Sequence, residues 1–193
     1  MVKLFKIKDR FLLGVVAGLA GNTIKMAIDE ISIKKKISQR SFRETAAGVW
    51  VSNRKEALNI KGQILGGLLD FGMGMLGGIA SVSLLSKTGR DHIITKGITS
   101  GIAMGSLITF VLGTLPINQI RPKDAASNLS YMVSHAAYGL VTTTVAAKLG
   151  HPSLFDTKPQ NNYLAPTELT SEQKKLHNTP EPKYHKTQKL ERA

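Results

Sequence analysis

The sequence contains no cysteine, and this absence excludes a disulfide framework, a thiolate metal site and a cysteine nucleophile. Acidic residues are also scarce: 13 Asp and Glu stand against 26 Lys and Arg, which gives a formal net charge of +13. Such an excess is typical of nucleic-acid binders and of membrane proteins whose basic flanks face anionic lipid head groups. The positions of the charged residues along the chain distinguish these two classes of protein.

Charged residues are nearly missing from three long stretches of the chain. None occurs in residues 97–115, none apart from the titratable His135 occurs in 125–147, and Asp70 stands alone in 62–85. These lengths are close to the roughly 20 apolar residues that a membrane helix needs. The aromatic residues lie mostly in or beside the apolar stretches, which favours membrane spans over a nucleic-acid-binding surface. A third interpretation, a soluble basic protein, predicts release from membranes by alkaline carbonate.

A fourth apolar stretch, residues 11–24, follows a basic N-terminus and is interrupted by Lys25. A signal peptide begins in the same way, but the three further apolar stretches favour an uncleaved membrane helix. We therefore predict an all-helical fold: a four-helix transmembrane bundle with glycine-rich interfaces and a disordered C-terminal tail. The predicted units are spans at 10–33, 62–85, 96–115 and 125–147 within a membrane domain 1–150, then a polar tail 151–193.

The basic loop 34–61 carries Trp50 and has two interpretations. It forms either a helix that lies on the head groups with Trp50 at the interface, or a solvated loop with one packed tryptophan. In the tail, proline and mixed charges predict disorder, and the capping-box spacing of Thr170 and Gln173 predicts a brief helix at 170–176. Near-membrane Lys and Arg are almost equal on the two sides, so the positive-inside rule leaves the topology open, with a lean toward both termini in the cytoplasm.

Small residues recur at every fourth position of the second and third spans, a glycine-zipper pattern. Such spacing lets helix backbones approach closely, and close packing drives association in lipid because hydrophobic attraction between helices is weak there. A short link joins these two spans, so we expect their glycine faces to pack against each other. Any face left uncovered is open to a second copy or to another membrane protein. The candidate packing positions are Gly14, Gly18, Gly62, Gly66, Gly74, Gly78, Gly97, Gly101, Gly105 and Gly113.

Three ionisable residues lie inside predicted spans, namely Lys25, Asp70 and His135. A charge near the bilayer centre costs about 2.5 to 3.5 kcal/mol, so each group needs a partner or water. If the spans alternate in direction, the helical rise places all three at a similar depth. The favoured interpretation is a structural Lys25–Asp70 pair and a hydrogen-bonded histidine. The alternative is a small proton- or cation-coupled carrier or channel subunit, with Asp70 as the exchanging carboxylate, His135 as relay and Lys25 as counter-charge.

No motif predicts an enzyme. The tripeptide Asp70-Phe71-Gly72 matches the metal-binding tripeptide of protein kinases, but no catalytic-loop motif precedes it. The other histidines lack metal-ligand spacing, and the sequence has neither a phosphate-binding loop nor a nucleophile elbow. We expect no catalytic residue, metal, cofactor or nucleic-acid partner, and a structural or interaction role in a bilayer whose anionic head groups face the basic loops.

Five residues of the first predicted span form a pattern that can be compared with known families: Gly14, Ala17, Gly18, Lys25 and Asp29. This pattern resembles the first span of the YagU-like family of small multi-pass bacterial inner-membrane proteins, and His135 resembles a histidine in their last span. The chain lacks the proline-arginine stretch that follows the first span in that family. The resemblance implies a multi-pass protein of the bacterial cytoplasmic membrane and carries no established biochemical activity.

Overall fold

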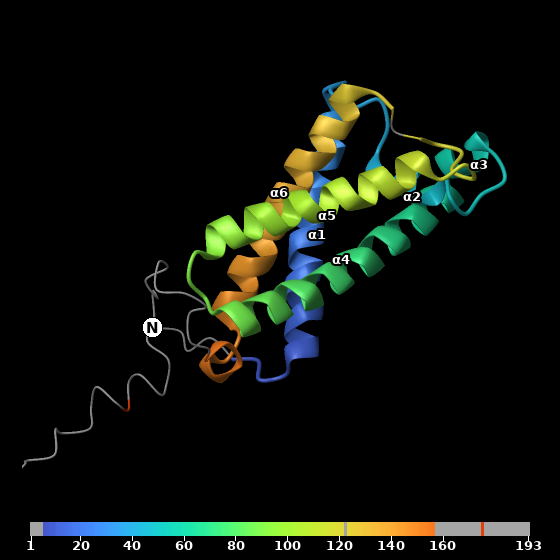
Figure 1. The fold of residues 1–193 in the computed structure, drawn as a ribbon. Coiled ribbons are helices and arrows are strands. Elements are labelled where there is room, and N and C mark those ends of the chain that lie inside the picture. The colour runs from blue at the N-terminus through green and yellow to red at the C-terminus, as the bar shows by residue number, and fades with distance from the viewer. Residues whose placement is uncertain (1–5, 122, 157–174, 176–193) are drawn as a thin grey trace, which may run out of the picture.

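The computed structural model describes residues 6–121, 123–156 and 175 (Figure 1). Its long helices are α1 (Arg10–Lys34), α4 (Ile60–Thr88), α5 (Ile93–Thr114) and α6 (Ala125–Leu149). Its short helices are α2 (Phe42–Ala47), α3 (Arg54–Leu58) and the 3-10 helix η1 (Pro152–Phe155). The all-helical prediction is confirmed for these residues, and each predicted span coincides with one long helix apart from small shifts at the ends.

Polar side chains cap the starts of three long helices, α1, α4 and α6. Asp9 accepts a hydrogen bond from the Leu12 amide at the start of α1, and Asn59 accepts one from the Gly62 amide at 2.9 Å at the start of α4. These caps satisfy amides that have no partner within the helix. Helix α4 ends at Gly89, whose φ of 81° lets the chain turn tightly toward α5. The link is so short that α4 and α5 must run in opposite directions.

The four long helices are arranged in the order α4, α1, α6, α5 through their packing contacts. In Figure 1, α4 and α5 run as two diagonals across the steeper α1 and α6. Helices α4 and α5 touch each other very little. The predicted packing of their glycine faces against each other is therefore wrong. Tyr138 of α6 and Met104 of α5 lie at Gly77 of α4, and the Tyr138 hydroxyl donates to the Gly74 carbonyl at 2.6 Å.

The glycines of α4 face α1 at one end and the loop helices at the other. A Cβ atom at Gly18 of α1 would collide with the Gly74 carbonyl, and one at Gly78 would collide with the Gly14 carbonyl. Toward its start, α4 places Gly66 against the backbone of Arg43 in α2 and Gly62 against the backbone of α3. The stripe of small residues on α4 thus lets three helices, α1, α2 and α3, approach its backbone closely.

The glycines of α5 face α6 instead. A Cβ atom at Gly97 would collide with Thr143, one at Gly101 with the His135 carbonyl, and one at Gly105 with the His135 side chain. Helix α6 contributes Gly139, which meets the backbone of α5 in the same way. The predicted Gly113 is half-buried near the end of α5. Among the long helices, the two glycine stripes therefore serve two separate pairs, α1 with α4 and α5 with α6.

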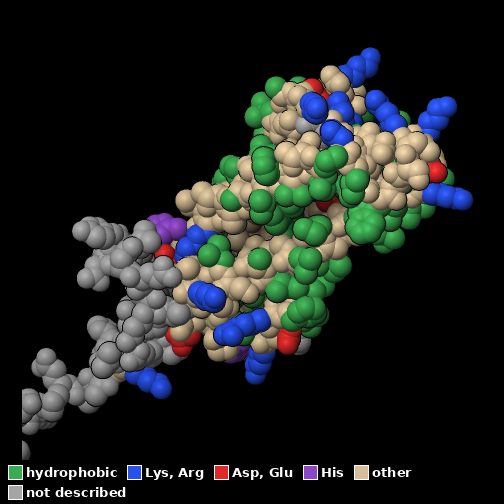
Figure 2. All heavy atoms as spheres, turned by 45° about the vertical axis from the view of Figure 1, so that its right-hand side comes forward, with side chains coloured by type: hydrophobic (Ala, Val, Ile, Leu, Met, Phe, Trp, Pro, Cys, Tyr) green, Lys and Arg blue, Asp and Glu red, His purple; other side chains and the backbone are tan. Residues whose placement is uncertain are grey.

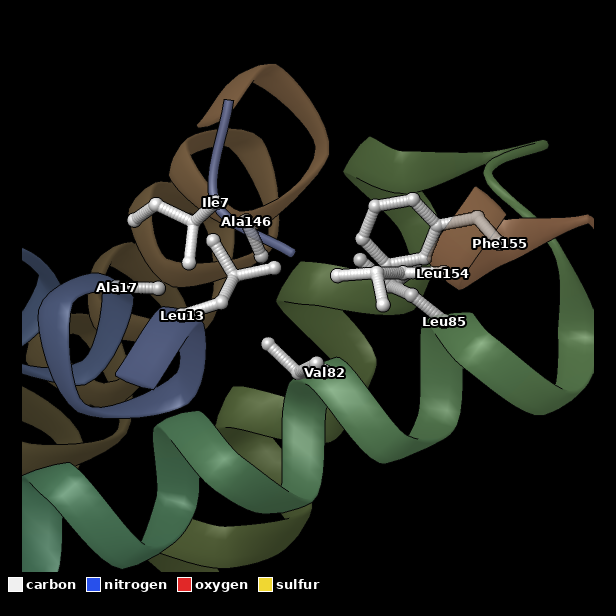
Figure 3. Packing of buried hydrophobic residues seen from close by; sticks show 8 residues of the cluster. All are labelled: Ile7, Leu13, Ala17, Val82, Leu85, Ala146, Leu154 and Phe155. Carbon is white, nitrogen blue, oxygen red and sulfur yellow. The ribbon is translucent and has the colours of Figure 1, made fainter. Parts of the chain in front are cut away.

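One end of the bundle, which we call the terminal end, carries the start of α1, the link between α4 and α5, and η1. Its buried side chains form an apolar cluster (Figure 3), made of Ile7, Leu13, Ala17, Val82, Leu85, Ala146, Leu154 and Phe155. Because η1 supplies two of these residues, the folded part extends past the predicted domain boundary at Gly150. The predicted disordered tail from residue 157 onward, with its brief helix, lies outside the described residues except for Lys175.

Three of the helices, α1, α4 and α5, are long and apolar enough to cross a membrane, whereas α6 is more polar and is not among them. On α4 and α5, large apolar side chains such as Leu68, Leu76 and Phe110 point away from the protein and are 60 to 70 % exposed. Figure 2 shows Lys and Arg gathered at the two ends of the molecule, with hydrophobic side chains between them. Helix α6 packs between α1 and α5, although Leu129 and Val133 near its start are also exposed.

Candidate functional site

Two of the three predicted intramembrane groups form a buried ion pair. The Lys25 ammonium of α1 donates to the Asp70 carboxylate of α4, and each side chain is only 3 % exposed. The amide oxygen of Asn22, one turn before Lys25, lies 3.4 Å from the same ammonium. Asp70 occupies the position between Gly66 and Gly74 in the small-residue stripe, where the close approach of α1 and α4 brings a carboxylate within reach of Lys25.

His135 is close to this pair but does not bond to it. Its Nδ1 atom lies 2.7 Å from the Tyr131 carbonyl of the same helix, and the side chain is 1 % exposed. Its ring meets the Phe42 ring edge-on at 5.0 Å, while the Lys25 ammonium lies 4.2 Å from the centre of that ring. Lys25 and His135 therefore lie against the same Phe42 ring, and Asp70 joins them through its bond to Lys25.

Phe42 begins α2, a helix that the sequence analysis did not predict at this place. Its side chain is buried, and its ring also packs edge-on against Tyr131 at 5.3 Å. Ser41 and Glu44 form a capping box, with reciprocal hydrogen bonds of 3.1 Å between side chain and backbone. The spacing of Ser41 and Glu44 is visible in the sequence and would have located this helix.

The loop 34–61 differs from both of its predicted forms. Helix α2 does not lie on the surface: most of its residues are buried, it packs on α4, and its Phe42 contacts Asp29 of α1 and Tyr131 of α6. The packed-tryptophan alternative is wrong as well, since Trp50 is 68 % exposed. The loop thus folds back into the bundle and then returns to the surface at Trp50.

Asp29 is a further buried carboxyl group, and it was not predicted as part of the site from the sequence. It lies four residues after Lys25, on the same face of α1, and is 3 % exposed. Its Oδ2 atom accepts a hydrogen bond of 2.9 Å from the Phe42 amide. Its Oδ1 atom, the Asp70 Oδ2 atom and the Asn22 amide nitrogen are buried and have no hydrogen-bond partner in the described part of the chain. We call Asn22, Lys25, Asp29 and Asp70 the polar cluster.

The polar cluster combines two carboxyl groups with one ammonium. Buried charges are tolerated only when they are paired or neutralised, so this composition makes the cluster sensitive to protonation. Across the described residues, no group of three or more His, Asp or Glu side chains is arranged to hold a metal ion. The arrangement can fix the register of α1 against α4, and it can bind a proton.

A second ion pair lies at the opposite end from the apolar cluster, which we call the loop end. Arg40 contacts Asp124 at 3.1 Å and donates to the Arg121 carbonyl at 2.7 Å, so the loop is tied to the start of α6. Burial acts to raise the pKa of Asp124, but hydrogen bonds from Ser127 and the charge of Arg40 outweigh it and hold the pKa below its usual range. Both side chains are partly exposed, in contrast with the Lys25–Asp70 pair.

No protein-family model matches the chain, and the comparisons with curated proteins and with solved structures found no match. The resemblance to the YagU-like proteins therefore stays a prediction from five residues and a histidine. The function has to be inferred from the geometry of this chain.

Proposed function

We propose that the chain is a multi-pass protein of the bacterial cytoplasmic membrane, that α1, α4, α5 and α6 all cross the bilayer, and that its role is structural or interaction-based. The observation that carries the proposal is an inverted distribution of side chains. Among the described residues, the buried set holds as many polar as hydrophobic side chains, while large apolar side chains cover the outer faces of α4 and α5. Water-soluble domains expose most of their polar residues. An apolar solvent around the helices accounts for the inversion.

Helix α6 fits a membrane interior in spite of its polar composition. Its hydroxyl groups bond to its own backbone: Thr143 donates to the Gly139 carbonyl at 2.9 Å, and Thr144 donates to the Leu140 carbonyl at 2.7 Å. Serine and threonine are common where membrane helices pack, because they are small and their hydroxyls can be satisfied locally. Since α6 lies between α1 and α5, most of its polar surface meets protein and not lipid.

Single-cysteine labelling tests the proposal cleanly, because the natural chain has no cysteine. Lys55→Cys lies at the loop end, Lys87→Cys at the terminal end, and Leu76→Cys on the outer face of α4 between them. In intact membranes, a membrane-impermeant maleimide should reach Lys55→Cys and Lys87→Cys from opposite sides. It should label Leu76→Cys only after denaturation.

The side from which each site reacts also decides the open topology. Labelling of Leu76→Cys at the rate of the other two sites, or of both lysine positions from the same side, contradicts the proposal. Release of the parent chain by alkaline carbonate would contradict it independently and would favour a soluble basic protein.

The interaction role calls for a surface that the chain itself leaves open. Gly74 and Gly101 are already covered by α1 and α6, so enlarging them damages the fold and not an oligomer. Gly72 of α4 faces outward, because no neighbouring atom lies within 4 Å of the position that a Cβ atom would take there. If a second copy or another membrane protein packs on this face, Gly72→Leu should abolish the complex isolated from native membranes while leaving the monomer folded. Recovery of the same complex with Gly72→Leu would exclude this face.

One observation supports the alternative of a proton- or cation-coupled carrier. The polar cluster holds two buried carboxyl oxygens without partners, on Asp29 and on Asp70. Asp70→Asn in reconstituted vesicles tests this alternative. Loss of a pH-dependent flux supports the pathway, whereas unchanged flux, or no flux in the parent, removes it and leaves the cluster with a structural role.

A further inference from the structure

We propose that the polar cluster binds one exchangeable proton, that Asp29 carries this proton, and that Phe42 is the barrier between it and the water at the loop end. The proposal rests on the membrane location proposed above, since lipid around the helices leaves the two ends of the bundle as the routes for water. It adds to the carrier alternative a specific site and a specific side of entry, and it holds whether or not the proton crosses the membrane.

The first step is the balance of charge around Asp29. The ammonium of Lys25 is bonded to Asp70, which leaves an ionised Asp29 without a compensating partner. The Arg43 guanidinium of α2 is the next cation, but it pairs with Glu30 at 2.9 Å and is partly exposed. An unpaired charge at 3 % exposure is strongly disfavoured, and one bound proton makes the cluster neutral.

The titratable groups of α6 do not supply the missing positive charge. A proton on the His135 Nε2 atom would place a second cation beside Lys25 on the same Phe42 ring, at a side chain that is only 1 % exposed. Tyr131 is neutral or anionic and cannot carry a positive charge. Its hydroxyl donates to the Arg40 carbonyl at 2.9 Å. The compensating proton therefore belongs to a carboxyl group.

The hydrogen bonds indicate which carboxyl group holds it. Asp70 is in ionic contact with Lys25, and this contact favours its charged form. Asp29 binds the Phe42 amide through Oδ2 and can do so whether or not Oδ1 is protonated. Its Oδ1 atom is buried and has no partner among the described residues, so a proton there removes a charge without breaking any bond. Asp29 is thus the neutral member of the pair.

The packing indicates from which side the proton arrives. Toward the terminal end, the apolar cluster fills the space between α1, α4 and α6 and excludes water (Figure 3). Toward the loop end, the cover is α2, a six-residue helix whose first residue places its amide on Asp29 and its ring on Lys25. Polar contacts hold this cover, including Gln63 with Glu44 at 3.0 Å. Displacing Phe42 would open the cluster to water.

The experiment uses the full chain in liposomes and dicyclohexylcarbodiimide, which reacts with protonated carboxyl groups in apolar surroundings. Mass spectrometry of the parent should find one adduct on Asp29 near neutral pH, and the yield should fall as the pH rises. Asp29→Asn should lose the adduct. Asp70→Asn should also lose most of it although Asp29 is still present, because Lys25 then becomes the partner of Asp29 and favours its ionised form. A merely structural Asp29 would not respond to Asp70 in this way.

Phe42→Ala tests the barrier, with Phe110→Ala as the matched control because Phe110 is 67 % exposed on the outer face of α5. Because water at Asp29 favours its ionised form, the adduct yield near neutral pH should fall several-fold in Phe42→Ala and stay at the parent value in Phe110→Ala. Phe42→Leu, which keeps more of the apolar volume, should fall between them and provides the test if Phe42→Ala does not fold. Equal adduct yields for the Phe42 and Phe110 variants overturn the barrier.

The remaining outcomes distinguish a bound proton from other ligands, and they test the membrane location independently of the proton site. An adduct on Asp70 in place of Asp29, or a yield that does not depend on pH, overturns the proton site. Protection by sodium ions at constant pH identifies a metal cation as the ligand and overturns it as well. Carbonate extraction of the same liposomes reports on the membrane location separately, so a retained chain without an adduct contradicts this proposal alone.

Discussion

The half of the bundle near the terminal end and the half that contains the polar cluster use the same helices but pack different side chains between them. In the first, Leu13, Val82 and Leu85 are fully buried against other hydrocarbon groups. In the second, α1 meets α4 through the Lys25–Asp70 ion pair and meets α6 through hydroxyl groups, with Ser32 and Ser130 2.8 Å apart. Within a few turns, the contact between α1 and α4 thus changes from the packing of apolar side chains to an ion pair.

This difference determines what each half can specify. Apolar side chains pack at high density but accept many similar neighbours, so they stabilise the fold without dictating a single register. Buried charges and hydrogen bonds are satisfied in few geometries, and an unpaired one is expensive. The polar half therefore fixes the register of α1 against α4 and is the part of the molecule where chemistry can occur.

The largest expected effect comes from removing one member of the buried ion pair. Lys25→Met leaves two carboxyl groups without an ammonium and should lower the free energy of unfolding by about 3 to 5 kcal/mol. The double variant with Asp70→Leu should recover most of this loss, because no buried charge is then left unpaired. Thermal unfolding of the purified variants in detergent measures the coupling between the two sites. A mild effect of Lys25→Met would mean that the polar half is hydrated.

A comparable loss without any rescue is expected in the apolar half. Leu85→Ala removes a fully buried side chain and should cost about 2 to 5 kcal/mol, depending on how far the cavity collapses. Leu68→Ala is the control, since Leu68 is 70 % exposed on the same helix. The loss should be independent of pH and should add to that of Lys25→Met. Strong coupling between the two variants would contradict the division of the bundle into separate halves.

The long helices could be predicted because charge marks their ends. Basic residues and prolines separate the apolar stretches, and the predicted spans consequently match α1, α4, α5 and α6 closely. The partner of each glycine stripe could not be predicted. Spacing shows that a backbone can approach, but Gly74 and Gly101 have the same local pattern and face different helices. The choice depends on the whole arrangement, in which the Tyr138 hydroxyl of α6 reaches the Gly74 carbonyl of α4.

Only the part of the candidate site that follows from the depth of residues in the bilayer could be predicted. Lys25 and Asp70 were expected at a similar level, and the structure places them in contact. The contact between Phe42 and Asp29 was missed because the capping box of Ser41 and Glu44 marks where α2 begins but not where this six-residue helix packs, which tertiary contacts determine. His135 lies beside the pair but forms a hydrogen bond with its own helix, and its depth along the helix alone could not predict this partner.

A smaller effect is expected at the boundary between the two halves, where Gly18 lies one turn before Asn22. The methyl group of Gly18→Ala would collide with the Gly74 carbonyl, and the forced separation should cost about 1 to 3 kcal/mol. Gly72→Ala is the matched control on α4: its Cβ meets nothing within 4 Å, and it should be neutral or stabilising by about 0.4 to 1 kcal/mol. Equal unfolding temperatures for the two variants would contradict the close approach of α1 and α4.

The smallest effect concerns the ion pair at the loop end, which shows what a charge contributes when water can reach it. Arg40 and Asp124 are 18 % and 21 % exposed, against 3 % for each member of the interior pair. Asp124 also caps α6 through the Ser127 amide at 2.8 Å, so Asp124→Ala should cost about 1 kcal/mol, most of it from the lost cap.

The pH dependence of this loss follows from the direction of the shift. Because folding lowers the pKa of Asp124, its electrostatic contribution is complete above the usual aspartate value and disappears as the pH falls through the lower, folded value. Unfolding curves of the parent and of Asp124→Ala should therefore approach each other in acid. A gap that keeps its full size after Asp124 is protonated would assign the whole effect to the cap and none to Arg40.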